Sequence, residues 1–301
     1  MIKYFYKFFY ISISKFLLTI DLFFRKIFNR NGFLPLVHDY IESKQYYSKI
    51  INNKKIVFFC PSSRTFIRVQ QLYTKEPETL NWVNNFQLQN SNKIVFWDIG
   101  ANIGLYSIYA ALKFKDIKII AFEPSTSNTR TLSRNISINN LEGKINIFPL
   151  ALSEKENIIS YFNETRFAEG GSMSNFISNT DHKGEILQEN EIKNKYTLFG
   201  TSIDYLIINN ILEVPNYIKI DVDGIEDLIL KGARNLLNNT NLKELSIEMN
   251  PTNLEQYKFI NKLMEENGFK QIVSTNSRLL NDRNYKLGLN EIVNVIFKRN
   301  N

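Results

Sequence analysis

From residue 92 onward, short apolar segments alternate with segments of helical periodicity, and this alternation limits the fold more than any other feature of the chain. The expected strands are 94–97, 118–122, 145–150, 217–222, 243–249 and, at the end, 291–297. The expected helices between them are 105–112, 126–139, 226–237 and 253–267. Strands that are apolar along their whole length are typical of sheets covered by helices on both faces. The pattern therefore predicts a doubly wound α/β fold with a mostly parallel sheet.

The first 30 residues combine many aromatic and aliphatic side chains with six basic residues and one acidic residue, Asp21. No apolar run there reaches the roughly 20 residues needed to cross a bilayer. On a helical wheel, one arc holds these apolar residues: Phe5, Phe9, Ile13, Phe16, Leu17, Ile20, Phe23, Phe24 and Ile27. We therefore expect residues 1–33 to form a basic amphipathic helix. Such a helix packs on the protein's own core or lies on an anionic membrane surface, and both interpretations stay open.

The positive charge is concentrated in this amino-terminal segment, which carries +5 of the net +7. A nucleic-acid-binding protein needs basic residues spread along the phosphate backbone, so we expect no nucleic-acid partner. The chain has one cysteine, Cys60, and two histidines, His38 and His182, which make a poor zinc site. We predict no metal ligands. A single thiol also favours a cytoplasmic protein, with peripheral attachment to the inner face of the plasma membrane if residues 1–30 bind lipid.

Between the amino-terminal helix and the alternating region, the periodicity is weak. Residues 34–90 are expected to form a connector and a short β-hairpin, with β-rich segments at 55–60 and 65–69 joined by a turn at 61–64. Residues 91–301 are expected to form the main domain. Within it, 162–195 fit neither period and are predicted to be a long loop of the kind that covers binding sites.

The first expected strand runs into a glycine-containing loop at 98–104. Gly100 and Gly104 allow a sharp turn and a close approach of the backbone to a ligand, and Asn102 tolerates unusual dihedral angles. A pyrophosphate-binding loop of the form G-x-G-x-x-G needs glycine at 102 and 105, where the chain has Asn102 and Leu105. Asp98, two positions before the first glycine, suits a cationic ligand. The loop therefore favours S-adenosylmethionine, which carries a sulfonium and an ammonium group and no phosphate.

A second acidic residue, Glu123, ends the second expected strand and is followed by Pro124. A carboxylate at this place accepts hydrogen bonds from both ribose hydroxyls of an adenosine ligand. The predicted cofactor-binding residues are Asp98, Gly100, Asn102, Gly104, Glu123 and Pro124.

These motifs resemble those of the FkbM family of S-adenosylmethionine-dependent methyltransferases. The resemblance extends to four further blocks, 122–125 with 134–135, 149–153, 203–206 and 218–226, and covers roughly 92–270. It implies a class I methyltransferase, Rossmann-like domain and O-methyl transfer. Two positions depart from the family signature "IKIDVEGAE", since Asp223 stands for its glutamate and Ile225 for its alanine.

Three carboxylates, Asp221, Asp223 and Glu226, follow the strand expected beside the cofactor strand. We predict that they accept the proton of an acceptor hydroxyl, and Glu248 at the end of the next strand is able to join them. Binding of a divalent cation that lowers the pKa of the hydroxyl is the alternative for the same carboxylates. Each also has a structural interpretation, because Asp223 suits a turn with Gly224 and Glu226 suits a helix amino terminus.

The favoured function is O-methylation of a sugar hydroxyl in a cell-surface glycan or a lipid-linked precursor. An NAD-dependent oxidoreductase of the same fold class is the alternative enzyme, although its glycine pattern is missing. A catalytically inactive, membrane-associated adaptor is the third hypothesis.

Overall fold

The computed structural model describes residues 2–28, 32–88, 93–172, 174–177, 187–274 and 292–300. The chain forms two compact units, residues 1–46 and residues 47–301, and each is described by itself. The three-part division expected from the sequence stays a prediction.

The first unit is a pair of helices, α1 (Ile2–Phe28) and α2 (Leu34–Glu42). The buried carboxylate of Asp21 accepts a hydrogen bond from the Leu34 N–H at the start of α2, 2.8 Å away, and pairs with Arg25 at 2.6 Å. A carboxylate at a helix amino terminus satisfies a free N–H and interacts favourably with the helix dipole. The first residues of the expected connector are therefore helical, and Pro35 is tolerated because it lies in the first turn of α2.

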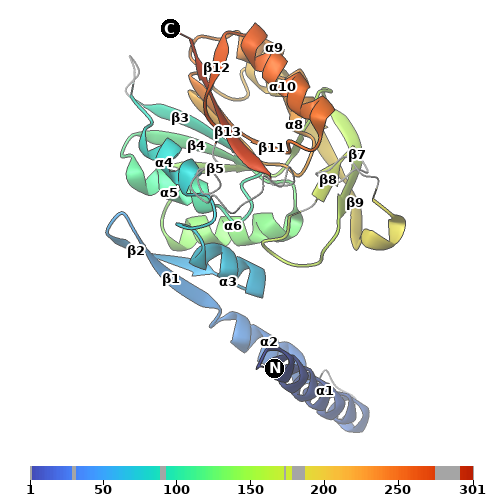
Figure 1. Ribbon diagram of the computed structural model, residues 1–301. Coiled ribbons are helices and arrows are strands. Elements are labelled where there is room, and N and C mark those ends of the chain that lie inside the picture. The colour runs from blue at the N-terminus through green and yellow to red at the C-terminus, as the bar shows by residue number, and fades with distance from the viewer. Residues whose placement is uncertain are drawn as a thin grey trace. The chain divides into compact units, whose positions relative to one another are not determined.

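The second unit is built on a seven-stranded sheet with the strand order β12-β13-β11-β10-β3-β4-β5 (Figure 1). Its strands are β3 (Ile94–Ile99), β4 (Ile117–Phe122), β5 (Ile145–Phe148), β10 (Tyr217–Ile220), β11 (Glu244–Met249), β12 (Phe269–Ser274) and β13 (Val293–Arg299). The pairs from β11 to β5 are all parallel, and β13 runs antiparallel to both of its neighbours. This confirms the predicted doubly wound, mostly parallel fold. The order departs from that of a dinucleotide-binding sheet by the insertion of β13 next to β11.

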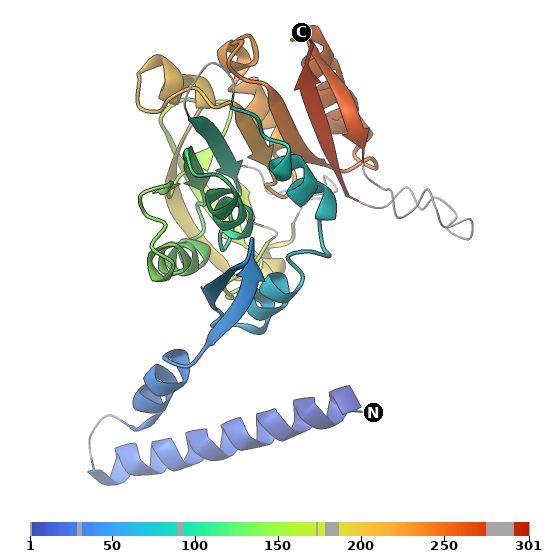
Figure 2. The ribbon, with the colours of Figure 1, turned by 90° about the vertical axis from the view of Figure 1, so that its left-hand side faces the viewer.

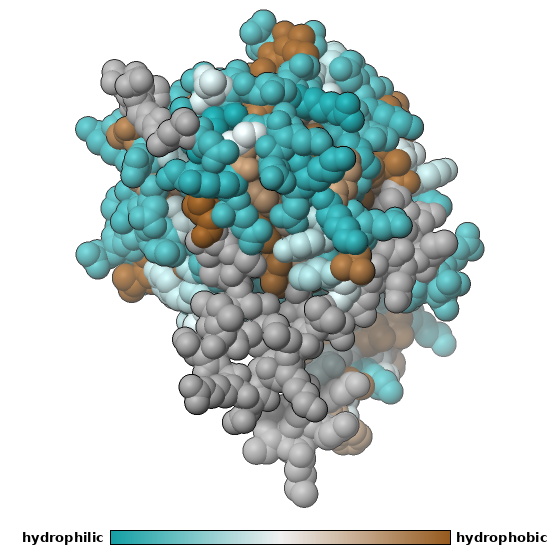
Figure 3. Space-filling model, turned by 45° about the horizontal axis from the view of Figure 1, so that its top comes forward, coloured by the Kyte–Doolittle hydropathy of each residue, from teal (hydrophilic) through white to brown (hydrophobic). Residues whose placement is uncertain are grey.

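Helices cover both faces of this sheet and enclose two hydrophobic cores (Figures 1 and 2). One core lies under α7 (Ile203–Ile208), α8 (Glu226–Lys231), α9 (Arg234–Leu237) and α10 (Leu254–Glu266). The other lies under α4 (Pro77–Asn84), α5 (Leu105–Lys113) and α6 (Thr126–Ile138). On the face that Figure 3 shows, hydrophilic residues dominate and hydrophobic ones form small, separate groups.

The β-hairpin lies earlier in the chain than the sequence predicted. It joins β1 (Tyr46–Ile51) and β2 (Lys54–Phe59) through Asn52 and Asn53, both of which have positive φ angles, 47° and 61°. Two such residues match the turn that favours tight hairpins. The expected second strand is instead helix α3 (Ser63–Gln70), which begins with a capping box between Ser62 and Thr65. The hairpin prediction was therefore wrong in its pairing, because the cap outweighs the β-branched residues that follow it.

Side chains of the flanking helices hold the hairpin and α4 against the main fold. The side-chain amides of Asn135 on α6 and of Asn139, its C-cap, form hydrogen bonds with the β2 backbone at Phe59 and Val57, respectively. On α4, the Trp82 indole N–H donates to Glu244 at 2.9 Å. Strand β2 and helix α4 are thereby fixed beside the sheet.

A second, four-stranded sheet occupies part of the region expected to be a long loop. It contains β6 (Ala151–Leu152), β7 (Ile158–Glu164), β8 (Ser174–Phe176) and β9 (Asn194–Thr201), and a 3₁₀ turn, η1 (Glu189–Glu191), precedes β9. The loop prediction for 162–195 was wrong at both ends, since β7 and β9 pair from Ile158↔Gly200 to Glu164↔Asn194. It was also wrong at 174–176, where β8 pairs with β7. Residues 165–172 do form a loop, and residues 173 and 178–186 lie outside the described residues.

The carboxylate of Asp204 joins two parts of the second unit that lie far apart in sequence. It accepts hydrogen bonds from the Asn235 and Leu236 N–H groups of α9 at 2.8 and 3.0 Å. We predict that Asp204→Ala lowers the free energy of unfolding by about 1–3 kcal/mol, because one buried and one partly buried N–H group lose their acceptor. Urea unfolding measures the change, with Glu142→Ala at an exposed loop position as the control. Equal stability of the two variants would contradict this role.

Candidate functional site

The loop after β3 has the left-handed backbone expected from its sequence. The φ angles are +83° at Gly100, +52° at Asn102 and +87° at Gly104. A Cβ atom added to Gly100 would lie 1.9 Å from the carbonyl oxygen of Asp221. The loop therefore approaches the end of β10 so closely that only glycine fits at its first turn.

Glu123 lies at the end of β4, beside this loop, and is buried. Its carboxylate accepts hydrogen bonds from the Asn102 N–H at 2.7 Å and the Ser125 N–H at 2.9 Å. Burial raises the pKa of Glu123 to about 7, although these hydrogen bonds oppose the shift. Each carboxylate oxygen keeps a second lone pair, so both can also accept a ligand hydroxyl. Half-buried Pro124 leads into Ser125, the cap of α6.

Asp98 is buried within β3 and has one oxygen without a protein partner. Its Oδ2 accepts a hydrogen bond from the Ser107 hydroxyl at 2.6 Å, while Oδ1 has no hydrogen-bond partner in the described part of the chain. Burial raises the pKa of Asp98, even though nearby Lys219 opposes the shift. A buried acceptor left without a donor is unusual in a folded protein, and it fits a site that a donor-bearing ligand completes.

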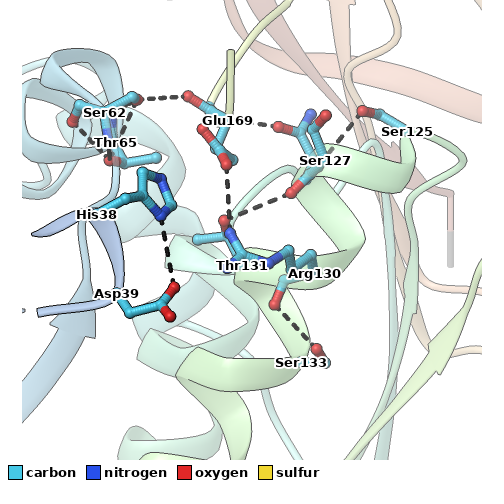
Figure 4. Close-up of polar contacts among 12 residues, drawn as sticks. His38, Asp39, Ser62, Thr65, Ser125, Ser127, Arg130, Thr131, Ser133 and Glu169 are labelled. Carbon is cyan, nitrogen blue, oxygen red and sulfur yellow. Dashed lines mark hydrogen bonds and ion pairs between the residues drawn. The ribbon is translucent and has the colours of Figure 1, made fainter. Parts of the chain in front are cut away.

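The loop 165–172 lies against the glycine loop, α3 and α6. The Gly171 carbonyl accepts hydrogen bonds from the side-chain amides of Asn102 at 2.7 Å and Asn128 at 3.2 Å. The Glu169 carbonyl accepts from the Ser62 hydroxyl at 2.7 Å, and its carboxylate lies 3.4 Å from Arg130, as Figure 4 shows. The loop therefore contacts a predicted cofactor residue directly. Its function as a binding lid stays a prediction.

Sequence reasoning missed Lys219, a fully buried lysine in β10. Its ammonium donates a hydrogen bond to the Asp221 carboxylate and lies 4.9 Å from the centre of the Tyr106 ring. Burial acts to lower the pKa of Lys219, but the charges of Asp221, Glu76 and Asp98 outweigh it and hold that pKa above its usual value. A lone lysine inside an apolar strand was the signal available in the sequence, since a buried charge requires partners.

Asp221 follows β10 directly and is the partner of this lysine. Burial would raise the pKa of Asp221, but the charge of Lys219 and then that of Lys75 hold it well below its usual range. Asp223, two residues on, has a φ of 43° and accepts a hydrogen bond from the Ser174 N–H at 3.3 Å. Asp221 is thus engaged by cations, and Asp223 by the start of β8.

Glu226 faces its own loop. Its Oε1 accepts from the Gly224 and Val222 N–H groups at 3.1 and 3.4 Å, and its Oε2 accepts from the Gln256 side chain at 3.2 Å. Burial and the charges of nearby aspartates raise the pKa of Glu226 to about 7. The three predicted catalytic carboxylates are therefore close in space but differ in their partners, and the contacts of Glu226 are those of a residue that shapes the turn.

Across the ranges that the structure describes, no group of three or more histidine, cysteine, aspartate and glutamate residues is arranged to hold a metal ion. The thiol of Cys60 is buried, and burial raises its pKa to about 11. A neutral, buried thiol is inert as a nucleophile or metal ligand.

The family model for the methyltransferase FkbM domain matches residues 98–270, more than half of the chain. The chain belongs to the FkbM methyltransferase family. The match begins at Asp98 and includes every residue predicted for the site. This family membership favours methyl transfer over the hydride transfer of the oxidoreductase alternative.

Curated relatives are similar to this FkbM protein over part of their length. Methyltransferase 1 of Beauveria bassiana is 26% identical over 150 residues, 45% of this chain and 56% of that protein. The hexuronic acid methyltransferase AglP of Haloferax volcanii is 29% identical over 147 residues, 49% of this chain and 53% of that protein. The chain thus matches about half the length of each.

Among solved structures, the FkbM methyltransferase of Methylobacillus flagellatus aligns with a TM-score of 0.42 and 14% identity. The alignment covers 87% of this chain and 58% of that one.

Substitutions at one glycine of the glycine loop and at two glycines elsewhere distinguish the cost of a steric clash from the cost of a left-handed backbone. We predict that Gly100→Ala lowers the free energy of unfolding by more than the roughly 1–2 kcal/mol that a left-handed backbone costs an L-residue, because the new methyl group also meets Asp221. Gly268→Ala, with a φ of +77° and open space around it, should show the backbone cost alone. Gly143→Ala has neither constraint and should be close to neutral. Urea unfolding of all three variants checks the order, which a Gly100→Ala change no larger than that of Gly268→Ala would contradict.

Proposed function

We propose that this FkbM protein transfers a methyl group from S-adenosylmethionine to a sugar hydroxyl of a glycan or a lipid-linked precursor. The observation that carries the proposal is that two buried carboxylates, Asp98 in β3 and Glu123 directly after β4, lie at the same ends of neighbouring parallel strands, beside the glycine loop. Parallel strands of this fold bind their ligands beyond these ends.

The residues present fit S-adenosylmethionine. Glu123 would hold the ribose hydroxyls through its remaining lone pairs, and the unpartnered oxygen of Asp98 fits the ligand's ammonium group, directly or through a water. Gly100, Asn102 and Gly104 would bring their backbone against the ligand, and Pro124 would lie beside the adenosine. When bound, S-adenosylmethionine supplies a methyl group on a positively charged sulfur.

The sugar acceptor is proposed from two considerations. AglP is named for its action on a hexuronic acid, and its similarity covers about half of this chain. Methyl transfer to a hydroxyl also needs alignment and a proton acceptor, and the carboxylates around Asp221 lie next to the glycine loop. In this proposal Asp221 and Asp223 line the acceptor site, and Glu226 shapes the turn that carries Asp223.

The ionisation of Glu123 predicts how cofactor binding depends on pH. With a pKa of about 7, Glu123 is mostly protonated at pH 5.5 and mostly ionised at pH 8, and only the ionised form accepts hydrogen bonds from both hydroxyls. The affinity for S-adenosylhomocysteine should therefore rise roughly tenfold or more from pH 5.5 to 8. Glu123→Gln should lose most of this dependence and weaken binding at pH 8 by about 1.5–3 kcal/mol. Titration calorimetry measures both, and an unchanged affinity at pH 8 removes Glu123 from the site.

We also propose that helix α1 attaches the chain to an anionic membrane surface. No helix in the described ranges is long and apolar enough to span a bilayer. Several apolar residues of the predicted arc are exposed, with exposed fractions between 43% and 65%: Phe9, Ile13, Phe16, Phe23, Phe24 and Ile27. Exposed aromatic residues on a basic helix fit lipid headgroups and the acyl boundary beneath them.

We predict that the full chain binds vesicles of phosphatidylglycerol more tightly than vesicles of phosphatidylcholine. The double variant Phe16→Gln with Phe23→Gln should reduce binding at least about tenfold, because each phenyl ring loses roughly 1.5–3 kcal/mol of apolar burial. Ile159→Gln, which removes an exposed apolar residue of β7, is the matched control. Co-sedimentation checks the prediction, and wild-type chain that stays in the supernatant with both vesicles refutes the attachment.

A further inference from the structure

The methyl acceptor's proton needs a base, and the carboxylates singled out by the sequence are already engaged. Asp221 bonds the buried ammonium of Lys219, and a carboxylate held ionised by cations is a weak base. Glu226 accepts three hydrogen bonds from its own turn and from Gln256. Asp223 accepts the Ser174 N–H.

Strand register brings a fourth carboxylate, Glu248, beside them. Ile220 of β10 pairs with Ile247 of β11 in parallel, so Asp221 and Glu248 occupy the next level of the sheet. Ile99 pairs with Ile220, which puts Gly100 at that level too. Residues at one level of neighbouring parallel strands point to the same face. Gly100, Asp221 and Glu248 therefore form one row across three strands.

The row of Gly100, Asp221 and Glu248 determines the distance between the glycine loop and Glu248. Neighbouring strands lie about 4.8 Å apart, so Glu248 is about 10 Å from Gly100 along the sheet edge. Asp221 lies between the two in this row, so an acceptor sugar that reaches from a cofactor at the glycine loop to the Glu248 carboxylate would lie beyond the strand ends, across Asp221. On its other side, Glu248 pairs with Asn294 of β13.

The carboxylate of Glu248 is available to a ligand. It has no hydrogen bond or ion pair with any residue that the structure describes, and the residue is only partly buried. The charged groups that act on it are Asp221, Asp223, Glu226 and Lys219. Burial and then the three carboxylates raise the pKa of Glu248 well above its usual value, and Lys219 opposes them. A base with a raised pKa holds a transferred proton better than an ordinary carboxylate does.

We propose that Glu248 is the general base of the methyl transfer, and this inference rests on the proposed function. The acceptor oxygen forms its bond to the methyl carbon while the carbon–sulfur bond of the sulfonium breaks and leaves its electron pair on sulfur. The hydroxyl proton passes to the Glu248 carboxylate and from there to solvent. Asp221 keeps its charge throughout, because Lys219 neutralises it.

The test compares Glu248→Gln and Glu248→Asp with the wild-type full chain. Labelled S-adenosylmethionine is the donor, and methyl glucuronide and a glycan fraction of the source cell are the acceptors. We expect Glu248→Gln to lower kcat by about 10²–10⁴-fold. The KM for the donor and the affinity for S-adenosylhomocysteine should stay within about threefold, since Glu248 lies outside the predicted cofactor site. Glu248→Asp should recover part of the rate, and Glu255→Gln, an exposed position on α10, should match the wild type.

A second readout does not depend on turnover. In carbon-13 spectra of glutamate carboxyl groups, the resonance absent from Glu248→Gln should titrate well above the usual glutamate value. A normal titration, or an unchanged kcat in Glu248→Gln, overturns the inference alone. A methyl ester product also overturns the inference alone, because a carboxylate acceptor has no proton to lose and needs no base. Cleavage of the product by mild alkali identifies such an ester. Failure of the wild-type chain to methylate either acceptor overturns the proposed function and this inference together.

Discussion

The proposed site depends on one interaction, the ion pair between the Lys219 ammonium, buried in the middle of the sheet, and the Asp221 carboxylate. Asp98, Asp221 and Glu76 are acidic residues near Lys219, and all three influence its ionisation. A buried carboxylate without a nearby cation is protonated or destabilises the fold. Lys219 allows carboxylates to be held close together at the ends of β3 and β10, where the fold binds its ligands. Removing a partner from a buried ion pair costs far more than the pair contributes.

In the proposed site, the cofactor and the methyl acceptor bind on opposite sides of Lys219 along the sheet. On the β3 and β4 side, Glu123 and the glycine loop form the proposed cofactor site, with a buried carboxylate beside a left-handed backbone turn. On the β11 side, Glu248 lies in the same row with no protein partner in the described ranges. The loop 165–172 contacts the cofactor side through Asn102, and the family signature from Asp221 to Glu226 shapes the turn between the two sides.

The sequence was sufficient for six of the seven strands of the main sheet, all except β12, and for the left-handed backbone of the glycine loop. Strands such as β3 are buried along their whole length, so a continuous apolar segment in the sequence reveals them. The two glycines after β3 indicated a tight turn, and both have positive φ angles. The second sheet was not predictable from periodicity, because the exposed positions of β7 hold the apolar residues Ile159 and Tyr161 and its buried positions include Phe162, so apolar and polar residues do not alternate in its sequence. The hairpin prediction was wrong because the two asparagines at 52 and 53 were not recognised as the turn.

The acceptor side was harder to predict for a physical reason. A row such as Gly100, Asp221 and Glu248 exists only once strands far apart in sequence are paired, and no local pattern contains it. Similarly, the sequence shows Glu226 as an acidic residue at a helix start but not the N–H groups that it accepts from its own turn.

The most direct test of the central claim is a calorimetric titration of the full chain with S-adenosylhomocysteine and, separately, with NADH. The structure around Asp98, Gly100 and Glu123 predicts saturable binding of one S-adenosylhomocysteine per chain and no binding of NADH, because the loop lacks the glycines of a pyrophosphate site. Tight binding of NADH with no binding of S-adenosylhomocysteine would contradict it.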